Sequence, residues 1–558
     1  GDAITTGYYN TALGKDALTT NTLSSLNVAI GHSALKAMSA GNAETHNVAV
    51  GSNAGLSVTT GIQNTLIGGL AGDALTDADS NVSMGYQSLS GDTLGSKSVA
   101  VGAFSLNVQN FTSATDSMNT AVGYASGGAV TTGVQNTLIG AEAGDAITTA
   151  SYNTAVGQGS LGSTTTGINN TAVGRTSLFV NTTGTQNVAI GMDALQQNST
   201  GSQNTAVGRS ALITNTTASN NTALGYAALH ANTTGTHNTA VGANALDANI
   251  GGHDDTAVGY GVLGANTTGY SNVGVGGGAS YAAAALAANT TGYGHSALGA
   301  GALAQNTTGA LNTAVGRQAM YSSTTGSNCV AVGALALDAN TTGAENTAVG
   351  NNAGTAITTG NGHVIVGMNA LKACTTGTYN TAIGRESLGG DTTGYANTAV
   401  GNGALSGVTT GDFNAGIGYD AQTTSATVNG QFVLGDANIS DLRCNDTSIS
   451  ALSDSRDKTN VIDSPYGLDF INTVRPVQFL WDTRSGNCKD GSTRIGFLAQ
   501  ELLAATDGNN AVLDLVLDDN PEQLEAKYGN LLPIAIQAIK ELSTQLDAAL
   551  ARITTLEG

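Results

Sequence analysis

The sequence has 558 residues and a mass of 55.2 kDa, and it is built from small, mostly uncharged side chains, with 77 Gly, 4% aromatic and 10% charged residues. Its apolar fraction of 40% is too high for an acidic disordered tail, and so few aromatic residues are unusual for an enzyme core. The formal net charge of −21 repels nucleic acid and anionic membranes, so we expect no nucleic-acid partner. No apolar run approaches the ~18 residues of a membrane span, so we expect no membrane insertion.

Composition divides the chain into two parts. All four Pro and the only Trp lie after residue 460, whereas the long first part is poor in charge and free of Pro. We predict a repeat shaft over residues 1–436, a stalk or linker over 437–452 and a C-terminal domain over 453–558. Because the chain begins inside a repeat and without Met, we interpret it as a fragment whose N-terminal attachment region is missing.

A 17-residue period runs through the first part. Alignment on the Gly of NTAVG and its variants gives 25 repeats, from Gly14 to Gly435, with insertions of 3, 4 and 6 residues. The consensus is NTAVGxxALxxNTTGxx. One such unit cannot bury an apolar face alone, so successive units must stack. The pattern therefore predicts a mainly β, elongated solenoid of 25 coils, in which each Thr-Ala-Val run forms a short parallel strand.

Several positions of the repeat carry predictions of their own. The residue before the Gly is apolar in all 25 copies, which predicts one continuous buried file, with the preceding Ala facing outward. Asn stands four places before the Gly in 19 of 25 copies, which predicts a ladder of side-chain amides bonding from coil to coil. The NTTG segment predicts a turn in which Gly supplies a positive φ.

The middle of each repeat, xxALxx, is compatible with a second strand or with a single helical turn. A helical turn is favoured because an apolar residue, Ile357, appears three places after Gly354, where Gly replaces the usual Leu. The six-residue insertion falls in the same piece, and its sequence over 281–288, YAAAALAA, is rich in helix-forming Ala.

Metal and cofactor chemistry is not indicated. The four Cys, at positions 329, 374, 444 and 488, form no CxxC pair and are too scattered to indicate a disulfide framework or a zinc site. No paired carboxylates recur at a fixed position, so no glycosidase site can be named. We predict no cofactor and no metal.

The end of the chain carries a heptad pattern. Within a helix predicted over 531–557, apolar residues step alternately by three and four. They are Leu532, Ala535, Ile539, Leu542, Leu546, Ala549, Ile553 and Leu556. Helices with such a seam associate with one another, so we predict a coiled-coil contact between copies of the chain.

Ordered motifs in this last part carry a resemblance to a known family. Ser453-Asp454-x-Arg456-x-Lys458 is followed by GLDFINTVRPVQFLW, GFLAQEL and YGNLLPIAIQAIKEL. Together they resemble the intramolecular chaperone of the endosialidase type, the peptidase S74 family. The 17-residue repeats resemble those of bacteriophage tail fibres and of some bacterial surface proteins.

The resemblance implies that the C-terminal domain drives trimerisation of the preceding fibre and then cuts itself off. It assigns Ser453 as nucleophile and Lys458 as base, with cleavage between Leu452 and Ser453. Lys can serve as base where desolvation favours its uncharged amine, and Ser-Lys is a known variant of the Ser-His-Asp arrangement. Autoproteolysis is the only enzyme activity that we expect, with no external substrate.

The sequence thus predicts a parallel homotrimeric tail fibre of a phage virion, extracellular after release, that binds a polysaccharide or protein receptor on a bacterial surface. Stacked repeats have many equivalent registers, and a C-terminal clamp would select one of them. Two alternatives stay open: a bacterial surface adhesin with the same shaft, and a polysaccharide-degrading tailspike.

Overall fold

The computed structural model describes residues 1–278, 283–436, 438–439, 453–480, 493–518, 521 and 524–558. It divides into two compact units, residues 1–363 (unit 1) and 364–558 (unit 2). The predicted stalk, 437–452, lies outside the described residues apart from 438 and 439.

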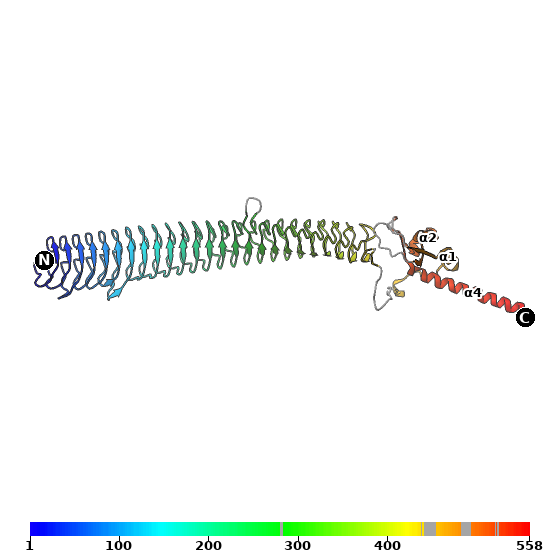
Figure 1. Ribbon diagram of the computed structural model, residues 1–558, viewed down its shortest axis with the longest axis horizontal. Coiled ribbons are helices and arrows are strands. Elements are labelled where there is room, and N and C mark those ends of the chain that lie inside the picture. The colour runs from blue at the N-terminus through cyan, green and yellow to red at the C-terminus, as the bar shows by residue number, and fades with distance from the viewer. Residues whose placement is uncertain (279–282, 437, 440–452, 481–492, 519–520, 522–523) are drawn as a thin grey trace. The chain divides into compact units, whose positions relative to one another are not determined.

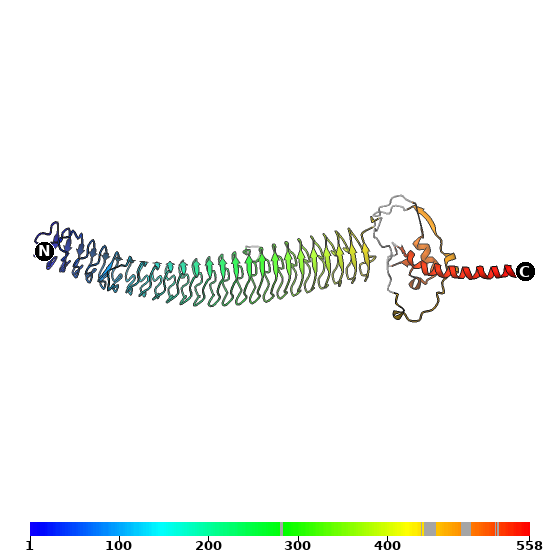
Figure 2. The ribbon, with the colours of Figure 1, turned by 90° about the horizontal axis from the view of Figure 1, so that it is seen from below.

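Unit 1 is a stack of coils, and the two views of Figures 1 and 2 show one short strand per coil, side by side in a single sheet. A separate two-stranded sheet pairs β6 (Gly95–Ser96) with β8 (Thr115–Asp116). The strands of the main sheet in this unit are β1 (Thr11–Leu13), β2 (Val28–Ile30), β3 (Val48–Val50), β4 (Thr65–Ile67), β5 (Val82–Met84), β7 (Val99–Val101), β9 (Thr120–Val122), β10 (Thr137–Ile139), β11 (Thr154–Val156), β12 (Thr171–Val173), β13 (Val188–Ile190), β14 (Thr205–Val207), β15 (Thr222–Leu224), β16 (Thr239–Val241), β17 (Thr256–Val258), β18 (Val273–Val275), β19 (Ser296–Leu298), β20 (Thr313–Val315), β21 (Val330–Val332) and β22 (Thr347–Val349).

Unit 2 begins with five more strands of the same kind. They are β23 (Val364–Val366), β24 (Thr381–Ile383), β25 (Thr398–Val400), β26 (Ala415–Ile417) and β27 (Phe432–Leu434). The main sheet thus has 25 strands. Pairing is parallel, and the register joins equivalent residues of successive coils, such as Thr137 with Thr154. The prediction of a mainly β, parallel solenoid of about 25 coils is confirmed.

The core of the coils is not the one that the sequence pattern predicted. In each main-sheet strand from β2 to β22 the middle residue is buried, and it is usually Ala, such as Ala240. The last residue of each strand, such as Val241, is half-buried or exposed, so the prediction of a buried file there is wrong. The middle residue of the strand faces the turn that follows, where a Leu such as Leu246 is fully buried. Because the coil is thin, this Leu leaves space for only a small side chain on the strand.

The volume of this core is shared between strand and turn. Where the middle residue of a strand is Leu66 instead of Ala, the adjacent turns carry Gly55 and Gly72 in place of Leu. A Cβ on Gly55 would approach Leu66 Cδ1 to 2.7 Å, and one on Gly72 would approach Leu66 Cδ2 to 2.8 Å. Leu66 therefore fits because both adjacent turns carry Gly, whereas Ile365 is buried with Gly354 in the turn before it and Leu371 in the turn after it.

The middle of each repeat is a pair of tight turns, and the predicted helical turn is wrong. Asn244 and Leu246 both have left-handed φ, at 54° and 53°. Left-handed residues occur singly and interrupt a right-handed helix. Here they let the consecutive residues Ala245 and Leu246 both point inward, as Ala285 and Leu286 do after the insertion. Residues 283–288 are likewise not helical, and 281–282 lie outside the described residues.

Two ladders of Asn side chains cross the coils. In the predicted ladder, Asn221 donates from its backbone N–H to Asn204 Oδ1 (3.0 Å) and from Nδ2 to the carbonyl of Gly235 (2.8 Å), which confirms the coil-to-coil bonding. The Asn of NTTG forms a second ladder, since Asn198 Nδ2 donates to Asn181 Oδ1 at 2.9 Å. These buried amides satisfy backbone groups that would otherwise be costly to bury.

The Gly of NTTG is required for a different reason from the one predicted. Gly235 does not have a positive φ, whereas Gly242, directly after the strand, has φ 135°. A Cβ on Gly235 would lie 2.2 Å from the carbonyl oxygen of Gly252 in the next coil. Close approach of successive coils, not turn geometry, therefore excludes a side chain there.

The last part of unit 2 is a small α+β region with a terminal helix, as predicted. Within the described residues from 453 onward, two antiparallel pairs, β28 with β29 and β30 with β31, accompany four α-helices. The elements are η1 (Ser455–Asp457), α1 (Leu468–Thr473), β28 (Val477–Leu480), β29 (Thr493–Gly496), α2 (Ala499–Ala505), α3 (Asn510–Leu513), β30 (Val516–Leu517), β31 (Glu525–Ala526), η2 (Tyr528–Asn530) and α4 (Leu531–Glu557).

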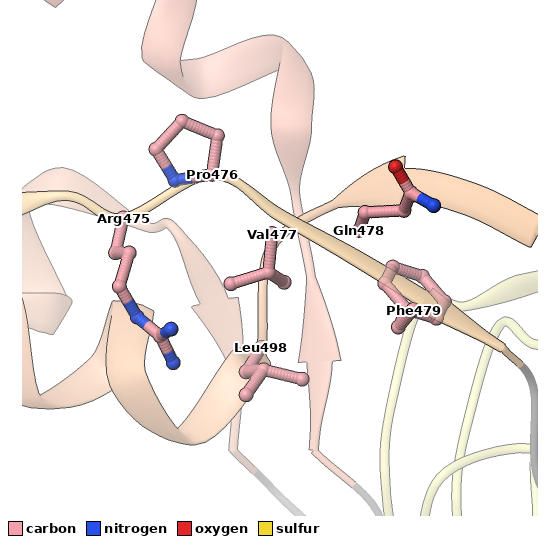
Figure 3. A pocket seen from close by; sticks show the side chains of 6 residues that line it. All are labelled: Arg475, Pro476, Val477, Gln478, Phe479 and Leu498. Atoms are coloured by element: carbon pink, nitrogen blue, oxygen red, sulfur yellow. The ribbon is translucent and has the colours of Figure 1, made fainter.

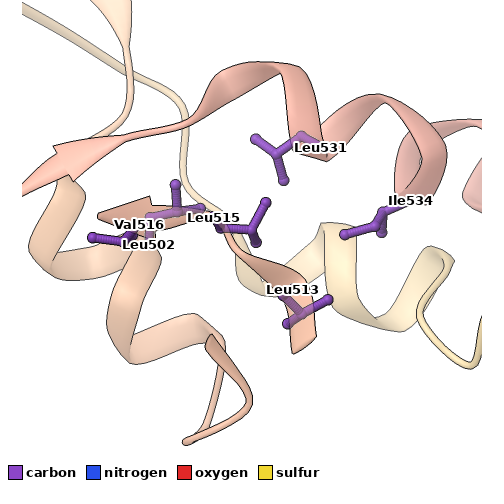
Figure 4. Packing of buried hydrophobic residues seen from close by; sticks show 6 residues of the cluster. All are labelled: Leu502, Leu513, Leu515, Val516, Leu531 and Ile534. Carbon is purple, nitrogen blue, oxygen red and sulfur yellow. The ribbon is translucent and has the colours of Figure 1, made fainter. Parts of the chain in front are cut away.

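A compact apolar cluster joins these elements. Figure 4 shows its six buried side chains, which come from α2, α3, β30, the start of α4 and one of the two residues between α3 and β30. They are Leu502, Leu513, Leu515, Val516, Leu531 and Ile534. Glu541 of α4 accepts a 2.7 Å hydrogen bond from the backbone N–H of Leu468, which ties the first turn of α1 to α4. That bond lowers the pKa of the Glu541 carboxyl.

Among the described residues, no helix is both long and apolar enough to cross a membrane.

Candidate functional site

The two residues assigned to the dyad, Ser453 and Lys458, lie on either side of the short 3-10 helix η1. This turn begins after Asp454, whose Oδ1 accepts a 2.9 Å hydrogen bond from the backbone N–H of Arg456. The Arg456 guanidinium also bonds both carboxylate oxygens of Asp454, and this contact holds the pKa of the Asp454 carboxyl below its ordinary value. A short turn fixed in this way reverses the chain between the two dyad residues.

The reversal brings the two side chains into contact. Lys458 Nζ donates a hydrogen bond to Ser453 Oγ at 2.5 Å. The two atoms are within the reach that a nucleophile and its base need, although Lys458 is the donor here and a base must accept the hydroxyl proton. The turn η1 lies between the two residues, so their side chains meet across a sequence separation of five residues.

Both side chains of the dyad are exposed in the single chain. Their neighbours Asp454 and Arg456 are polar, and no residue of this segment belongs to the buried cluster. Leu452, the residue on the other side of the expected cleavage site, lies outside the described residues. The Ser453 and Lys458 side chains therefore meet within one chain and are exposed to water there.

A pocket of about 450 Å³ lies elsewhere in this region, and Figure 3 shows the side chains that line it, from β28, the two residues before it and the residue before α2. They are Arg475, Pro476, Val477, Gln478, Phe479 and Leu498. Arg475 Nε donates to Glu501 Oε2 at 2.9 Å, and this pairing lowers the pKa of the Glu501 carboxyl. The guanidinium is thus already engaged by a carboxylate, and neither dyad residue lines the pocket.

Titratable side chains in the coils were not picked out by the sequence pattern. Asp255 replaces Asn in the first ladder and Asp391 replaces it in the second, and both are fully buried. Burial raises the pKa of Asp255 to about 7 and that of Asp391 to about 6. The sequence signal was present, because each is a carboxylate at a position where most coils have an amide.

Histidine and cysteine occupy the same ladders. His295 Nε2 lies 2.7 Å from the carbonyl oxygen of Gly309, and burial lowers its pKa to about 4. Cys329 and Cys374 are buried free thiols, while Cys444 and Cys488 lie outside the described residues. Within the described part of the chain, no group of three or more His, Cys, Asp or Glu side chains is placed to hold a metal ion.

Comparison with known proteins matches one part of the chain. Residues 453–513 match the family Peptidase_S74, described as the chaperone of endosialidase. No curated protein and no solved structure matched the chain. The matched segment begins at Ser453 and contains the whole dyad, η1 and the first elements of the α+β region. The chain therefore carries a Peptidase_S74 domain, the chaperone of endosialidase, at its C-terminus, after a β-solenoid consistent with the shaft of a tailspike or tail fibre.

Proposed function

We propose that this chain is the shaft and chaperone of a phage tail fibre that takes part in host attachment. The observation that carries the proposal is the succession of a parallel β-solenoid and a Peptidase_S74 domain in one chain. In the assembled virion it is a parallel homotrimer whose coils are 17-residue repeats, and the fibre presents a surface to a polysaccharide or protein receptor of the bacterial host. The register of the strands supports the coil length, since Ala155 pairs with Ala172.

The terminal helix supports a role in assembly. Seam residues of α4 such as Ile539, Leu546 and Leu556 are 66%, 58% and 84% exposed in the single chain. An apolar seam of this length is stable in water only when it is covered, and heptad seams are covered by other helices. In our proposal the helices of three chains associate first and fix a common register for the repeats that precede them.

The dyad supports self-cleavage. An uncharged Lys458 amine takes the proton of Ser453 Oγ, and Oγ forms a bond to the carbonyl carbon of Leu452. The C–N bond between Leu452 and Ser453 then breaks, and the protonated amine returns its proton to the departing Ser453 nitrogen. Water hydrolyses the resulting ester, so that the products are a carboxylate at Leu452 and a free amine and hydroxyl at Ser453.

In our proposal, trimer assembly supplies the apolar surrounding that Lys458 lacks in the single chain. The base must be uncharged, and an apolar surrounding favours the uncharged form of a Lys side chain. Because both dyad side chains are exposed in the single chain, we propose that neighbouring chains cover them in the trimer. Cutting then follows trimerisation and does not precede it.

The test is to follow the fragment 453–558 by mass spectrometry and gel electrophoresis after expression. The wild-type chain should be cut completely once it is trimeric, whereas Ser453→Ala should stay intact and trimeric. Lys458→Ala and Lys458→Arg should also stay intact, because a guanidinium cannot act as a base at neutral pH. The matched controls Ser455→Ala and Lys540→Arg, both at exposed positions, should cut like the wild type.

Two outcomes count against the proposal in different ways. A wild-type trimer that remains intact refutes self-cleavage and leaves the chaperone role standing. Cutting that persists in Ser453→Ala assigns the cleavage to an outside protease.

A further inference from the structure

The outward face of the main sheet carries an apolar file that the single chain does not bury. We define the outer file as the last residue of each main-sheet strand in unit 1, from Leu13 to Val349. All twenty are apolar, and all are half-buried or exposed. Leu224 and Leu298, for example, are 47% and 51% exposed.

Charge is excluded from the whole of this face. None of the main-sheet strands contains Asp, Glu, Lys or Arg at any of its three positions, although the turns and insertions between them carry such residues. The first residue of each strand also faces outward and is mostly Thr or Val. The face is therefore a band of β-branched and aliphatic side chains, a surface suited to packing against another sheet.

Folding of the single chain does not account for the outer file. The core beneath the sheet is complete with the middle Ala and the Leu of the turn, as Ala240 and Leu246 show. A side chain that points to water can be polar without loss, and corner positions of the same coils vary freely, from Leu311 to Glu345. A position that stays aliphatic in every coil while it is exposed indicates that something covers it.

We propose that the outer file docks against the same face of other copies of this chain. The inference rests on the proposed homotrimer and names the surface by which its shafts associate. A copy of the chain is the occupant that fits, because only a partner with the same spacing between coils can match an aliphatic side chain at every level of the stack. An uncharged face also allows identical chains to meet without repulsion, despite a net charge of −21 on each.

The available area is sufficient for a specific interface. Nine of the twenty side chains are 36–66% exposed and the other eleven are half-buried. A fully exposed aliphatic side chain presents on the order of 100 Å² of apolar surface, so the file offers roughly 500–800 Å² per chain. A stable protein interface needs about 800 Å² per partner. The outer file reaches that value together with the half-buried and exposed Thr and Val at the first position of each strand.

Hydroxyl-radical footprinting of the wild-type protein tests the inference, after native mass spectrometry has established the number of chains. Leu298 and Leu311 are a matched pair, since they are 51% and 54% exposed in the single chain, the first on the sheet face and the second at a corner. In the trimer we expect oxidation of Leu298 and Leu224 to fall at least fivefold below that of Leu311. Equal oxidation of Leu298 and Leu311 in a trimer overturns the inference and leaves the trimer in place, whereas a monomer refutes both.

A pair of substitutions gives an independent check. Leu298→Glu places a carboxylate from each chain on the shared face, whereas Leu311→Glu introduces the residue that already stands at the equivalent corner as Glu345. We expect Leu298→Glu to expose Leu224 to oxidation and Leu311→Glu to leave it protected. If Leu224 stays protected in both variants, the shafts do not meet through this face.

Discussion

The coils and the C-terminal region differ in how completely a single chain buries their side chains. In the coils nearly every inward side chain is fully buried, and most of the polar ones are paired through the two Asn ladders, with Ser323 and Asn306 among the exceptions. In the described residues of the C-terminal region the buried apolar cluster has six side chains, while Val461, Ile462 and Ile495 are each more than three-quarters exposed. A single chain completes the core of a coil but leaves much apolar surface of the Peptidase_S74 domain and of α4 uncovered.

The two parts therefore differ in what completes the burial of their apolar surface. The coils need neighbours in sequence to fold, because each coil caps the next. In our proposal the C-terminal region needs other chains, because the apolar seam of α4 and the Ser453–Lys458 pair are both exposed in the single chain. A substitution in the coil core should therefore act within one chain, and one on an outward surface should act between chains.

The largest effect is expected from a charge in the coil core. Ala240→Asp buries a carboxylate where Leu246 leaves no space or partner, which costs several kcal/mol. Val241→Asp, one residue later, places the charge on the half-buried outward face, so the coil should stay folded and association should weaken. Hydrogen exchange of the amides around Gly242 and Gly259 measures this, with fast exchange expected for Ala240→Asp at any protein concentration. Equal exchange in both variants would show that the two faces of the strand are wrongly assigned.

A pH dependence of intermediate size is expected from Asp255. Burial raises the pKa of its carboxyl from the ordinary 3.8 to about 7, while hydrogen bonds from Asn272 partly oppose the rise. The folded state therefore binds the proton more tightly than the unfolded state. The stability contribution is complete below about pH 4 and is lost as the pH rises through 7, by at most ~4 kcal/mol.

The measurement is the thermal stability of the shaft between pH 4 and pH 8. The midpoint should fall as the pH rises, and Asp255→Asn, which restores the residue of most coils, should flatten the curve. Asp391→Asn should remove a further part of the pH dependence of the midpoint, because the pKa of Asp391 is about 6. A curve that rises with pH in the wild type, or one that Asp255→Asn leaves unaltered, would contradict the assignment.

The smallest effect is expected at a gap in the second Asn ladder. Ser323 occupies the ladder position between Asn306 of the preceding coil and Asn340 of the following coil. Both Ser323 Oγ and Asn306 Oδ1 are buried without a hydrogen-bond partner. Ser323→Asn supplies an amide that can donate to Asn306 Oδ1, and it should stabilise the coils by ~1 kcal/mol. Thr325→Asn, at an exposed position of the same turn, should change the unfolding midpoint little. A gain in the control equal to that of Ser323→Asn would rule out the ladder as its cause.

Much of the coil could be predicted from the sequence because periodicity records stacking directly. The strand, its parallel pairing and the first Asn ladder follow from recurrence alone. The inward face could not be chosen in this way, since hydrophobicity ranks Val above Ala, whereas the space opposite Leu246 admits only Ala. The turn was misassigned because Leu rarely adopts a left-handed φ. A signal was nevertheless present, since Gly55 and Gly72 replace Leu at that position.

The candidate site, too, could be predicted from the sequence only in part. The pairing of Ser453 with Lys458 could be predicted from the resemblance to the endosialidase chaperone, and their side chains lie in contact. Their exposure could not be predicted, because it depends on which surfaces the fold leaves uncovered. The buried Asp255 was missed because a single carboxylate among many amides does not alter the periodic pattern.

Native mass spectrometry of the purified wild-type chain tests the central claim most directly. One spectrum reports both the number of chains and whether each has been cut before Ser453. We predict a complex of three chains, with the fragment 453–558 released or retained as a separate polypeptide, and three intact chains for Ser453→Ala. A stable monomer of uncut wild-type chain at micromolar concentration would contradict it.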